Sequence, residues 1–345
     1  MDAQNVKKVG VVVISYNGRE LLEKFLPSIL GSDYDDFDVY VIDNASTDGT
    51  TEFLRTQFPE INVINIPVNK GFTNGYVQGL AEVPNEYYVL VSSDIEVSKG
   101  WLRPVIELME SDPDIAACQP KVKSYDDKKM FEYSGSAGGY VDALGYPFCR
   151  GRMFFTMEED INQYDDTREI FWATGGCLFI RSALYHQAGG LDNDYYAHME
   201  EIDLCWRLKN MGYKIMVCPK SVVYHVGGHI ITYGSPVKVY RNFRNSLITN
   251  LKNMSLSEVW WKIPTRMTLD QVYQVKVLLS GNWKEWISIY KAHLHFILFL
   301  PKWIQKRKQA RQLVRNPNQS GIYKGSVVWA YFIKGIKTFK DLNFR

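Results

Sequence analysis

Apolar residues in the first half of the chain follow two alternating patterns, one typical of buried strands and one of amphipathic helices. Residues 9–14 form a β-branched run that stops at polar residues, and residues 21–30 then place apolar side chains three and four positions apart. Further apolar runs, separated by helical patterns, lie at 38–42, 62–66 and 87–91. Four strands that alternate with helices predict an α/β fold with a doubly wound, mainly parallel sheet.

The fourth predicted strand leads directly into two acids. Its apolar run passes through Ser92 and Ser93 to Asp94 and Glu96, at the carboxyl end, where open α/β sheets carry their chemistry. Carboxylates grouped there suit a hard divalent cation such as Mg²⁺ or Mn²⁺, which usually also takes oxygens from a substrate phosphate. An acidic turn that only closes a core strand is the better explanation for a single strand-end acid. The metal site is favoured because the other strands end in similar residues.

Polar residues follow the first three predicted strands as well. They comprise Ser15, Tyr16, Asn17, Asp43, Asn44 and, after the third strand, the turn 69–72 with Asn69, Gly71 and Phe72. Asn and Gly in such a turn supply a backbone that can approach a ligand closely. The chain holds neither a G-x-G-x-x-G motif after the first strand nor a P-loop, so a dinucleotide fold and a P-loop NTPase are not supported. Phosphates would therefore be neutralised by a metal at Asp94 and Glu96.

Composition is that of a globular protein. The chain has 345 residues, of which 46% are hydrophobic and 23% charged, so disorder is excluded. Its five cysteines are odd in number, scattered and never in a C-x-x-C pair, which indicates a reducing compartment rather than a disulfide framework or a structural zinc site. The first residues contain no apolar stretch of the kind found in signal peptides, and none is expected.

Charge divides the chain into two regions. Residues 1–250 carry 23 Lys and Arg against 34 Asp and Glu, a balance of −11, whereas residues 251–345 carry 17 against 4, a balance of +13. We predict a catalytic domain over 1–250 and a basic, aromatic-rich helical extension over 251–345. No apolar run in the extension approaches the ~20 residues needed to span a bilayer.

The extension interleaves Trp and Phe with Lys and Arg, which suits the interface of an anionic membrane. A helical bundle packed on the catalytic domain, with a solvated basic face, is an equally good interpretation and is compatible with the first. Nucleic acid is not an expected partner, because no nucleic-acid-binding module is recognisable.

The segment 195–207 contains the candidate catalytic acids. A helical pattern begins at Glu200, and at about 100° per residue Glu200, Asp203 and Arg207 share one face, with Asp203 and Arg207 placed for an i, i+4 ion pair. Glu201 points away from this face and has no internal partner. It is therefore the better candidate for a general base that takes the proton of an attacking hydroxyl. The alternative is that acids in a first turn only favour the helix dipole.

Two other segments contribute candidates. Residues 121–170 show little periodicity and are expected to form strands and loops that cover the bound substrates. Gly175 and Gly176, after Trp172, precede an apolar strand and leave room for another group near the backbone; Trp172 alone would equally well be a core residue. Two further strands are predicted at 214–218 and 222–225.

Several motifs in this order resemble family 2 glycosyltransferases of the GT-A fold, a Rossmann-like sheet flanked by helices, and within them the bacterial rhamnosyltransferase-like branch. The resemblance covers about residues 8–250. It is carried by the segments Val11-Val12-Val13-Ile14-Ser15-Tyr16-Asn17, Val41-Ile42-Asp43-Asn44-Ala45-Ser46-Thr47-Asp48-Gly49-Thr50, Asn69-Lys70-Gly71-Phe72, Ser93-Asp94-Ile95-Glu96-Val97 with Gly100-Trp101-Leu102, and Glu200-Glu201-Ile202-Asp203-Leu204-Cys205-Trp206-Arg207.

The resemblance implies an inverting transfer of a sugar such as rhamnose from a UDP- or dTDP-sugar to a hydroxyl of a cell-envelope glycan or lipid-linked acceptor. By resemblance Asp43 and Asn44 lie against the nucleoside, Asp94 and His225 hold the metal with Glu96, and the second acid of the last motif makes Glu201 the base, beside Glu200 and Asp203. His229 is the alternative to His225, and the basic segment 241–245 faces a pyrophosphate, a lipid phosphate or solvent. The candidates for contact with the nucleotide-sugar are Ser15, Tyr16, Asn17, Asp43, Asn44, Asn69, Gly71, Phe72, Ser93, Trp172, Gly175, Gly176 and Arg207.

One departure from the family pattern concerns the metal. The family often has an acid two places before Asp94, where this chain has Ser92, so the ion should bind more weakly or depend on Glu96 and the substrate phosphates. A catalytically silent nucleotide-sugar-binding subunit is therefore one alternative function. A sugar-phosphate nucleotidyltransferase is another, but it predicts a Gly-rich basic loop after the first strand, which residues 15–18 do not provide. The expected location is cytoplasmic, peripheral on the inner face of the plasma membrane.

Overall fold

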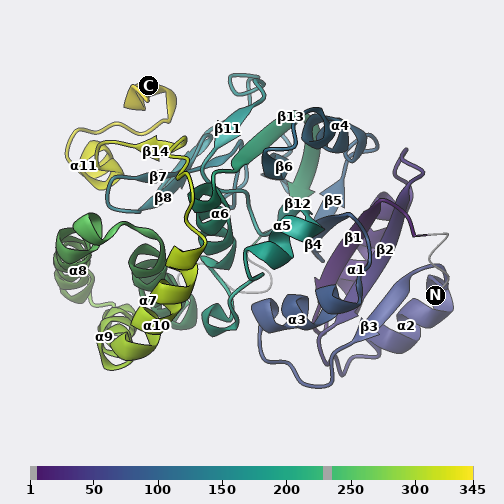
Figure 1. The fold of residues 1–345 in the computed structure, drawn as a ribbon, viewed down its shortest axis with the longest axis horizontal. Helices are drawn as coiled ribbons and strands as arrows, with labels where there is room; N and C mark the ends of the chain where they lie inside the picture. Colours follow the sequence, from purple (N-terminus) through teal and green to yellow (C-terminus); the bar gives the residue numbers. More distant parts are fainter. Residues whose placement is uncertain (1–5, 228–234, 345) are drawn as a thin grey trace.

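The computed structural model describes residues 6–227 and 235–344 and contains two β-sheets (Figure 1). Within the described residues the larger sheet has nine strands in the order β11-β13-β6-β12-β4-β1-β2-β3, with β5 paired to β13. Its strands are β1 (Val9–Ser15), β2 (Phe37–Asp43), β3 (Asn62–Asn65), β4 (Tyr87–Ser92), β5 (Ile95–Val97), β6 (Ile115–Ser124), β11 (Arg168–Ile170), β12 (Cys177–Arg181) and β13 (Lys214–His225).

The predicted alternation of strands and helices in the first half is confirmed. β1 pairs in parallel with both β2 and β4, and β2 pairs in parallel with β3, whereas β12 runs antiparallel to β4 and β6. The sheet is therefore parallel on one side and mixed on the other. The helices of this part are α1 (Arg19–Leu30), α2 (Thr50–Gln57), α3 (Phe72–Gly79), α4 (Arg103–Ser111), α5 (Ser182–Gln187) and α6 (Glu200–Met211).

Alternate residues of β1 enter two different cores. Val11 and Val13 pack in the cluster that includes Leu22 of α1, while Val12 packs in the cluster that includes Tyr76 of α3. This follows from the two-residue period of a strand that is covered on both faces. The register then aligns the strand ends, since Ser15 lies opposite Asp43 and Ile14 opposite Ser92. The candidate residues after β1, β2 and β4 thus share one edge.

The segment with little periodicity folds into the second sheet, in the order β10-β9-β8-β7-β14. Its strands are β7 (Gly139–Asp142), β8 (Pro147–Cys149), β9 (Arg152–Met153), β10 (Thr156–Met157) and β14 (Ile322–Tyr323). The two strands predicted at 214–218 and 222–225 are instead one strand, β13, whose pairing with β6 shifts register between Cys218 and Val222. A bulge of this kind bends a strand without ending it.

The C-terminal region packs against the rest of the protein. α7 (Pro236–Asn253) runs through position 250, and α8 (Leu256–Leu279), α9 (Trp283–Leu298) and α10 (Leu300–Gln312) lie beside it, on the side of the molecule away from β1–β3 (Figure 1). β14 pairs with β7, and α11 (Val327–Phe332) follows it. Among the described helices, none has the length and apolar character required to cross a membrane.

Buried ion pairs fasten α7 and α10 to the loop before α6. The Asp192 carboxylate accepts a 2.7 Å hydrogen bond from Lys252 of α7 and pairs with Lys306 of α10. Burial raises the pKa of Asp192, but the two ammonium groups outweigh burial and hold that pKa well below its usual range. Since the carboxyl is more acidic in the folded protein, it stabilises the fold above the ordinary pKa of Asp, and this contribution is lost as the pH falls.

We expect Asp192→Asn to lower the free energy of unfolding at pH 7 by about 2–3 kcal/mol, because it leaves two cations without their charged partner. Urea unfolding measures the change. The difference in the free energy of unfolding between the variant and the unmodified protein should become smaller below about pH 4. Asp112→Asn is the matched control, because Asp112 pairs with Lys214 at the surface and should contribute little. Equal losses in the two variants would contradict the fastening role.

Candidate active site

Two buried polar residues lie at the end of β2. Asp43 is 4% exposed and accepts a 2.9 Å hydrogen bond from the Ser46 backbone amide. Asn44 is 3% exposed, and its amide nitrogen donates to Asn69 Oδ1 at 3.2 Å and to the Gly71 carbonyl at 3.3 Å. Its Oδ1 atom has no hydrogen-bond partner within the part of the chain that the structure describes. The amide is thus held in place by the turn after β3, with its oxygen buried.

The turn after β3 is locked against the loop that precedes α6. Gly71 has φ +103°, and a Cβ there would lie 2.6 Å from the Tyr196 ring, so only glycine fits. The Thr73 backbone amide also donates to the Tyr196 carbonyl at 3.1 Å. Phe72 begins α3 directly after this glycine. The close approach expected at Gly71 is therefore made by the Tyr196 ring and not by a ligand. This contact brings Asn44 toward the start of α6.

Residues 15–17 line the same edge but differ in exposure. Ser15 is buried, Tyr16 is 55% exposed, and Asn17 joins the neighbouring loop by accepting from the Thr47 amide at 2.7 Å. Ser93 is buried at the end of β4. The structure therefore brings the candidates after β1, β2 and β4 to one region, with the Tyr16 ring in solvent.

Asp94 lies in the turn between β4 and β5 and faces His225 at the end of β13. Asp94 Oδ1 is 3.3 Å from His225 Nε2, and Glu132 Oε2 is 3.1 Å from His225 Nδ1. The Val226 amide donates to the Asp94 carbonyl at 3.1 Å. Burial lowers the pKa of His225, but the two carboxylates outweigh burial and raise it to about 10. Glu132 was missed at the level of sequence, because it lies in the segment without periodicity.

The chemistry of this group fits a divalent ion. A carboxylate oxygen and an imidazole nitrogen are both ligands that Mn²⁺ accepts, and a carboxylate on the second ring nitrogen fixes the orientation of a ligating histidine. Asp94 and His225 could hold the ion, and Glu132 could orient His225. In the described ranges, no group of three or more His, Cys, Asp or Glu side chains is arranged to hold a metal by itself. Oxygens of a substrate would have to complete the shell.

Glu96 does not join this group. It lies on β5 opposite Tyr224, forms an ion pair with Lys128, and is partly exposed, while its neighbours Ile95 and Val97 are buried. The expectation that Glu96 helps to hold the metal is thus not supported, because its carboxylate pairs with Lys128 instead. His229 lies outside the described residues.

The loop before α6 is conformationally unusual. Tyr196, His198 and Met199 all have positive φ angles, between 65° and 72°. Non-glycine residues rarely adopt this conformation, and it persists only where surrounding contacts impose it. Two acids, Glu200 and Glu201, follow at once as the first residues of α6.

The Glu200 and Glu201 side chains are packed against a glycine. A Cβ on Gly175 would lie 3.6 Å from Glu201 Cβ and 3.8 Å from Glu200 Oε1. The Oε2 atoms of both acids have no hydrogen-bond partner among the residues described. Burial raises the pKa of Glu201 to about 7, and burial together with repulsion from Glu201 raises that of Glu200. A carboxylate with a raised pKa near neutrality suits a general base.

Asp203 and Arg207 serve the fold. Their predicted ion pair is confirmed at 2.9 Å, and Asp203 also accepts from Lys252 at 2.9 Å and from Asn253 at 2.8 Å. Arg207 donates to the Ala188 and Gly190 carbonyls. Asp203 is 0% exposed, so these contacts leave it no surface for a substrate.

Trp172 is a core residue, because its indole donates to the Tyr140 carbonyl at 2.9 Å and it is 4% exposed. Gly176 has a different position. Its carbonyl accepts a 2.9 Å hydrogen bond from the Ser92 amide, which places the start of β12 beside the end of β4. The glycine pair therefore lies at the edge of the sheet next to the end of β4, whereas Trp172 packs in the core.

The basic segment at 241–245 clamps the loop before α6. The Asn245 amide nitrogen donates to the Tyr195 and Ala197 carbonyls at 3.1 Å and to the His198 carbonyl at 2.8 Å. Arg244 supports it by donating to Asn245 Oδ1 at 2.8 Å and to the Asp194 carbonyl at 2.5 Å. Arg244 and Asn245 of this segment therefore bind backbone carbonyls of the loop rather than facing solvent.

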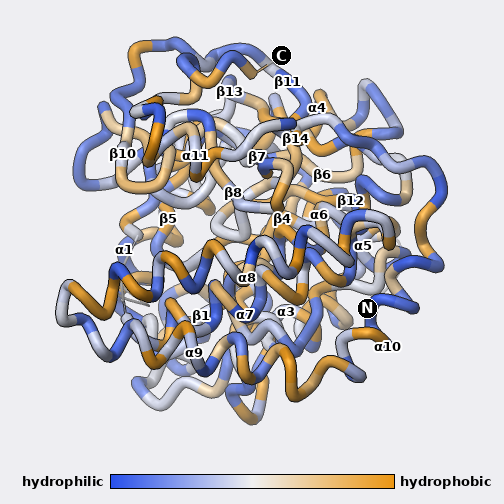
Figure 2. Tube along the Cα trace, turned by 90° about the vertical axis from the view of Figure 1, so that its left-hand side faces the viewer, coloured by the Kyte–Doolittle hydropathy of each residue, from blue (hydrophilic) through white to orange (hydrophobic). Residues whose placement is uncertain are grey.

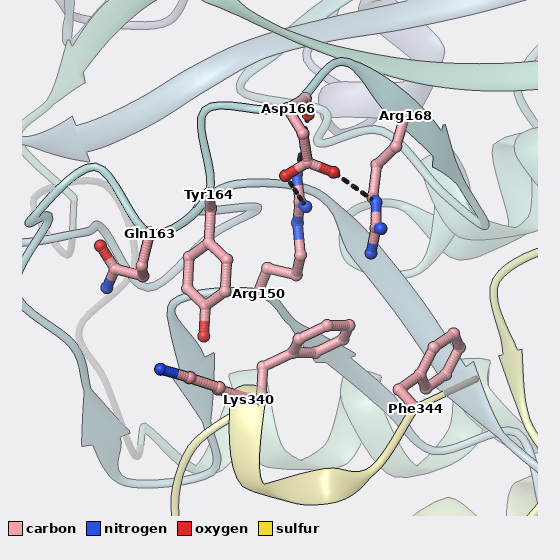
Figure 3. Close-up of a pocket in the computed structure, with 8 residues that line it drawn as sticks. Arg150, Gln163, Tyr164, Asp166, Arg168, Lys340 and Phe344 are labelled. Atoms are coloured by element: carbon pink, nitrogen blue, oxygen red, sulfur yellow. Dashed lines mark hydrogen bonds and ion pairs between the residues drawn. The ribbon is translucent and has the colours of Figure 1, made fainter.

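A hollow of about 440 Å³ lies elsewhere (Figure 3). In it Asp166 lies between Arg150 and Arg168, and Tyr164, Lys340 and Phe344 surround them. None of the candidate residues lines it. A smaller hollow of about 280 Å³ borders Glu132, Tyr133 and Val226 and is therefore next to the group around His225.

A family model described as "Glycosyl transferase family 2" matches residues 10–187, more than half of the chain. The protein belongs to glycosyl transferase family 2. It is thus a glycosyltransferase, and the matched residues contain the strand ends at Asp43, Asn44 and Asp94. The acids at 200 and 201 and His225 lie beyond the matched residues.

Similar proteins from three organisms agree with this family. The N-acetylglucosaminyl-diphospho-decaprenol L-rhamnosyltransferase of Mycobacterium tuberculosis is 24% identical over 273 residues, which are 75% of this chain and 88% of that one. The structure of the mannosyltransferase PcManGT from Pyrobaculum calidifontis with GDP-Man and Mn²⁺ has a TM-score of 0.52 at 16% identity, covering 90% and 86%. That of S. aureus TarS 1–349 with UDP has a TM-score of 0.51 at 16% identity, covering 88% and 90%. The predicted GT-A fold is confirmed.

We expect Asn245→Ala to loosen the loop 195–199, because three carbonyls lose their shared donor. Hydrogen exchange of the backbone amides in this loop should rise, and glycosyl transfer should fall on the order of tenfold to hundredfold as Glu200 and Glu201 lose their position. Asn250→Ala is the control on the same helix, since Asn250 donates one buried hydrogen bond to the Leu144 carbonyl. If both variants change exchange in the loop equally, the clamp is not specific to Asn245.

Proposed function

We propose that this family 2 enzyme transfers a sugar such as rhamnose, with inversion, from a UDP- or dTDP-sugar to a hydroxyl of a cell-envelope glycan or lipid-linked acceptor. One observation carries the proposal: the Asn44 amide, the Asp94–His225 pair and the Glu200–Glu201 pair all belong to elements that meet at one edge of the sheet. The name of the mycobacterial relative supports a rhamnosyl donor and a lipid-linked acceptor. The titles of the structural neighbours, which name GDP-Man and UDP, support a nucleotide-sugar.

In this proposal residues 1–250 form the catalytic domain and residues 251–345 its extension. Asp43 and Asn44 bind the nucleoside, with the Asn44 amide on the side of the base. An amide oxygen can pair with the N–H of uracil or thymine equally well. Gly175 and Gly176 leave room for the donor sugar beside the two acids.

Asp94 and His225 would hold a divalent ion, and Glu132 would keep the His225 ring in place. Such an ion would stabilise negative charge on the diphosphate oxygens. With Ser92 two places before Asp94 and Glu96 paired to Lys128, the protein itself supplies one carboxylate to the ion. Protein cations elsewhere in the site would then matter more for the leaving group.

Glu201 acts as the general base. Its carboxylate takes the proton of the acceptor hydroxyl while that oxygen forms its bond to the anomeric carbon, and the bond from this carbon to the diphosphate breaks. Burial keeps the Glu201 carboxylate poorly solvated and therefore basic. Burial and repulsion from Glu201 raise the pKa of Glu200, which lies beside it.

We expect Glu201→Gln to lower transfer by about 10²–10⁴-fold while donor binding is kept, because the amide cannot accept the proton. In the unmodified enzyme the rate should rise with pH through about 7, where the carboxyl ionises, and the residual rate of the variant should lack this step. Steady-state rates with UDP- and dTDP-sugars in Mn²⁺ or Mg²⁺ measure the loss of transfer and its pH dependence. Glu52→Gln, on the exposed side of α2, is the control. Near-normal turnover in Glu201→Gln would show that the base is another residue.

A catalytically silent nucleotide-sugar-binding subunit is the second candidate, favoured by Ser92. The same assays separate the two: retained nucleotide binding without turnover of any nucleotide-sugar, including hydrolysis, would favour the silent subunit.

We also propose that the extension lies on an anionic membrane surface, on the inner face of the plasma membrane. α8 and α9 expose large apolar side chains along with lysines, and orange and blue positions alternate along both helices (Figure 2). Those most exposed are Leu256, Trp260, Val272, Val275, Leu279, Trp283, Ile297 and Leu298. Basic helices with such a face bind anionic interfaces through burial of apolar area and through charge attraction.

Trp260→Glu combined with Leu279→Glu should reduce binding to vesicles containing phosphatidylglycerol at least tenfold, because both side chains are more than 70% exposed and the change adds negative charge. Co-sedimentation measures the bound fraction, with phosphatidylcholine vesicles for comparison. Ile161→Glu, at a 71% exposed position outside the extension, is the control. Unchanged binding of the double variant would refute the interfacial role of α8.

A further inference from the structure

The hollow of about 440 Å³ lies between the smaller sheet and the C-terminal segment (Figure 3). The turn between β8 and β9 supplies Arg150, and the loop before β11 supplies Tyr164 and Asp166. The C-terminal segment supplies Lys340 and Phe344. Sites for small ligands typically have volumes of about 300–1,000 Å³, so the hollow is large enough to hold one.

The hollow is lined by three cations and one carboxylate. Arg150 and Arg168 each lie 2.7 Å from a different oxygen of Asp166. Arg150 is 1% exposed, and its Nε atom also donates to a backbone carbonyl at 3.0 Å, so its charge is fixed in position. Arg168 is about half exposed and binds Asp166 through Nε, and the outer end of its guanidinium points toward the side where Phe344 lies (Figure 3). Lys340 is exposed at the other end of the hollow.

Other acids of the loop before β11 are bound to other partners. Glu158 accepts a 2.9 Å hydrogen bond from the Tyr164 hydroxyl. Burial and this carboxylate raise the pKa of Tyr164, which therefore remains a neutral donor. Asp160 and Asp165 both pair with Lys121. Among the described residues, Asp166 is the only acid that lines the hollow, which therefore has a balance of two positive charges.

Aromatic rings form the wall on the C-terminal side. Phe344 is partly exposed, and its ring centre lies 5.4 Å from that of Phe339, with 32° between the ring planes. The Phe339 ring contacts Tyr164 edge to face at 6.0 Å. The hollow thus combines an apolar wall with cations, which is the composition of a site for a ligand that has an apolar face and an acidic group.

We propose that this hollow is a second binding site, outside the active site, for a sugar that carries a carboxylate or a phosphate group. The acidic group lies against Arg168, with Arg150 behind it, because a guanidinium donates paired hydrogen bonds to the oxygens of either group. The C–H face of the sugar ring covers Phe344, and the Lys340 ammonium donates to a hydroxyl group at the other end.

The choice of a sugar rests on the proposed function, since an enzyme that extends a glycan meets such groups on its acceptor. The hollow is also connected to the active site through the segment 121–170. The Tyr164 ring lies 5.7 Å from the Phe131 ring, and Phe131 directly precedes Glu132, the partner of His225. A glycan bound at a second point stays on the enzyme, which raises the effective concentration of its reacting end.

Saturation-transfer NMR titration of the full chain with D-glucuronate, glucose 6-phosphate, glucose and inorganic phosphate tests the assignment. The two acidic sugars should bind at least tenfold more tightly than glucose or phosphate, because each of the latter makes only part of the contacts. Arg168→Gln and Lys340→Gln should each weaken the acidic sugars about tenfold and leave UDP binding unchanged. Arg55→Gln and Lys334→Gln, at exposed positions that do not line the hollow, are the matched controls.

Several results would overturn the inference. These are no binding of either acidic sugar, binding that neither variant weakens, or binding of phosphate as tight as that of glucose 6-phosphate, which would indicate a site for a simple anion. Vesicles containing phosphatidylglycerol distinguish a lipid headgroup: if the variants weaken only vesicle binding, the assignment to a sugar is wrong. Failure of the proposed function is a separate result, in which the protein turns over no nucleotide-sugar while it still binds glucuronate at Arg168.

Discussion

The site depends on a loop that would not hold its shape alone. Three non-glycine residues in left-handed conformations, Tyr196, His198 and Met199, each cost about 1–3 kcal/mol. Asn245 offsets this cost by donating to three carbonyls of the loop, and Arg244 holds Asn245 in turn. These hydrogen bonds therefore fix the position of the start of α6 and of its two acids. α7 thus fixes the position of two acids that precede it in the chain.

Burial of opposite charges at neighbouring points is the second organising feature. The acids Glu200 and Glu201 are desolvated and basic, whereas His225 is held protonated between Asp94 and Glu132. An ion that takes an imidazole nitrogen must displace its proton, so metal affinity in such a site is coupled to pH. The protein therefore buries two acids and a histidine held between two carboxylates at the same edge of the sheet.

The sequence was most informative where a local period determined the structure. The strands ending at Ser15, Asp43 and Ser92, and the Asp203–Arg207 pair, follow from two-residue and 3.6-residue patterns that tertiary contacts did not override. Glu132 and Asn245 could not be recognised, because their partners lie about 90 and 50 residues away, respectively, and no period encodes such contacts. Glu96 was misplaced because Asp94 and Glu96 were treated as the end of one strand, whereas a turn separates β4 from β5. The antiparallel direction of β12 could not be predicted either, because it depends on pairing with the distant strands β4 and β6.

The pairing of β14 with β7 has a consequence for biosynthesis. Val141 lies opposite Ile322, so the smaller sheet lacks its last strand until about 180 further residues have left the ribosome, which takes ~10–40 s at ordinary rates of translation. During that interval the Tyr140 and Phe148 rings lack the aromatic cover that Phe339 and Phe344 later give them. The aromatic side chains of the smaller sheet therefore stay partly uncovered on the nascent chain until the C-terminal residues have been synthesised.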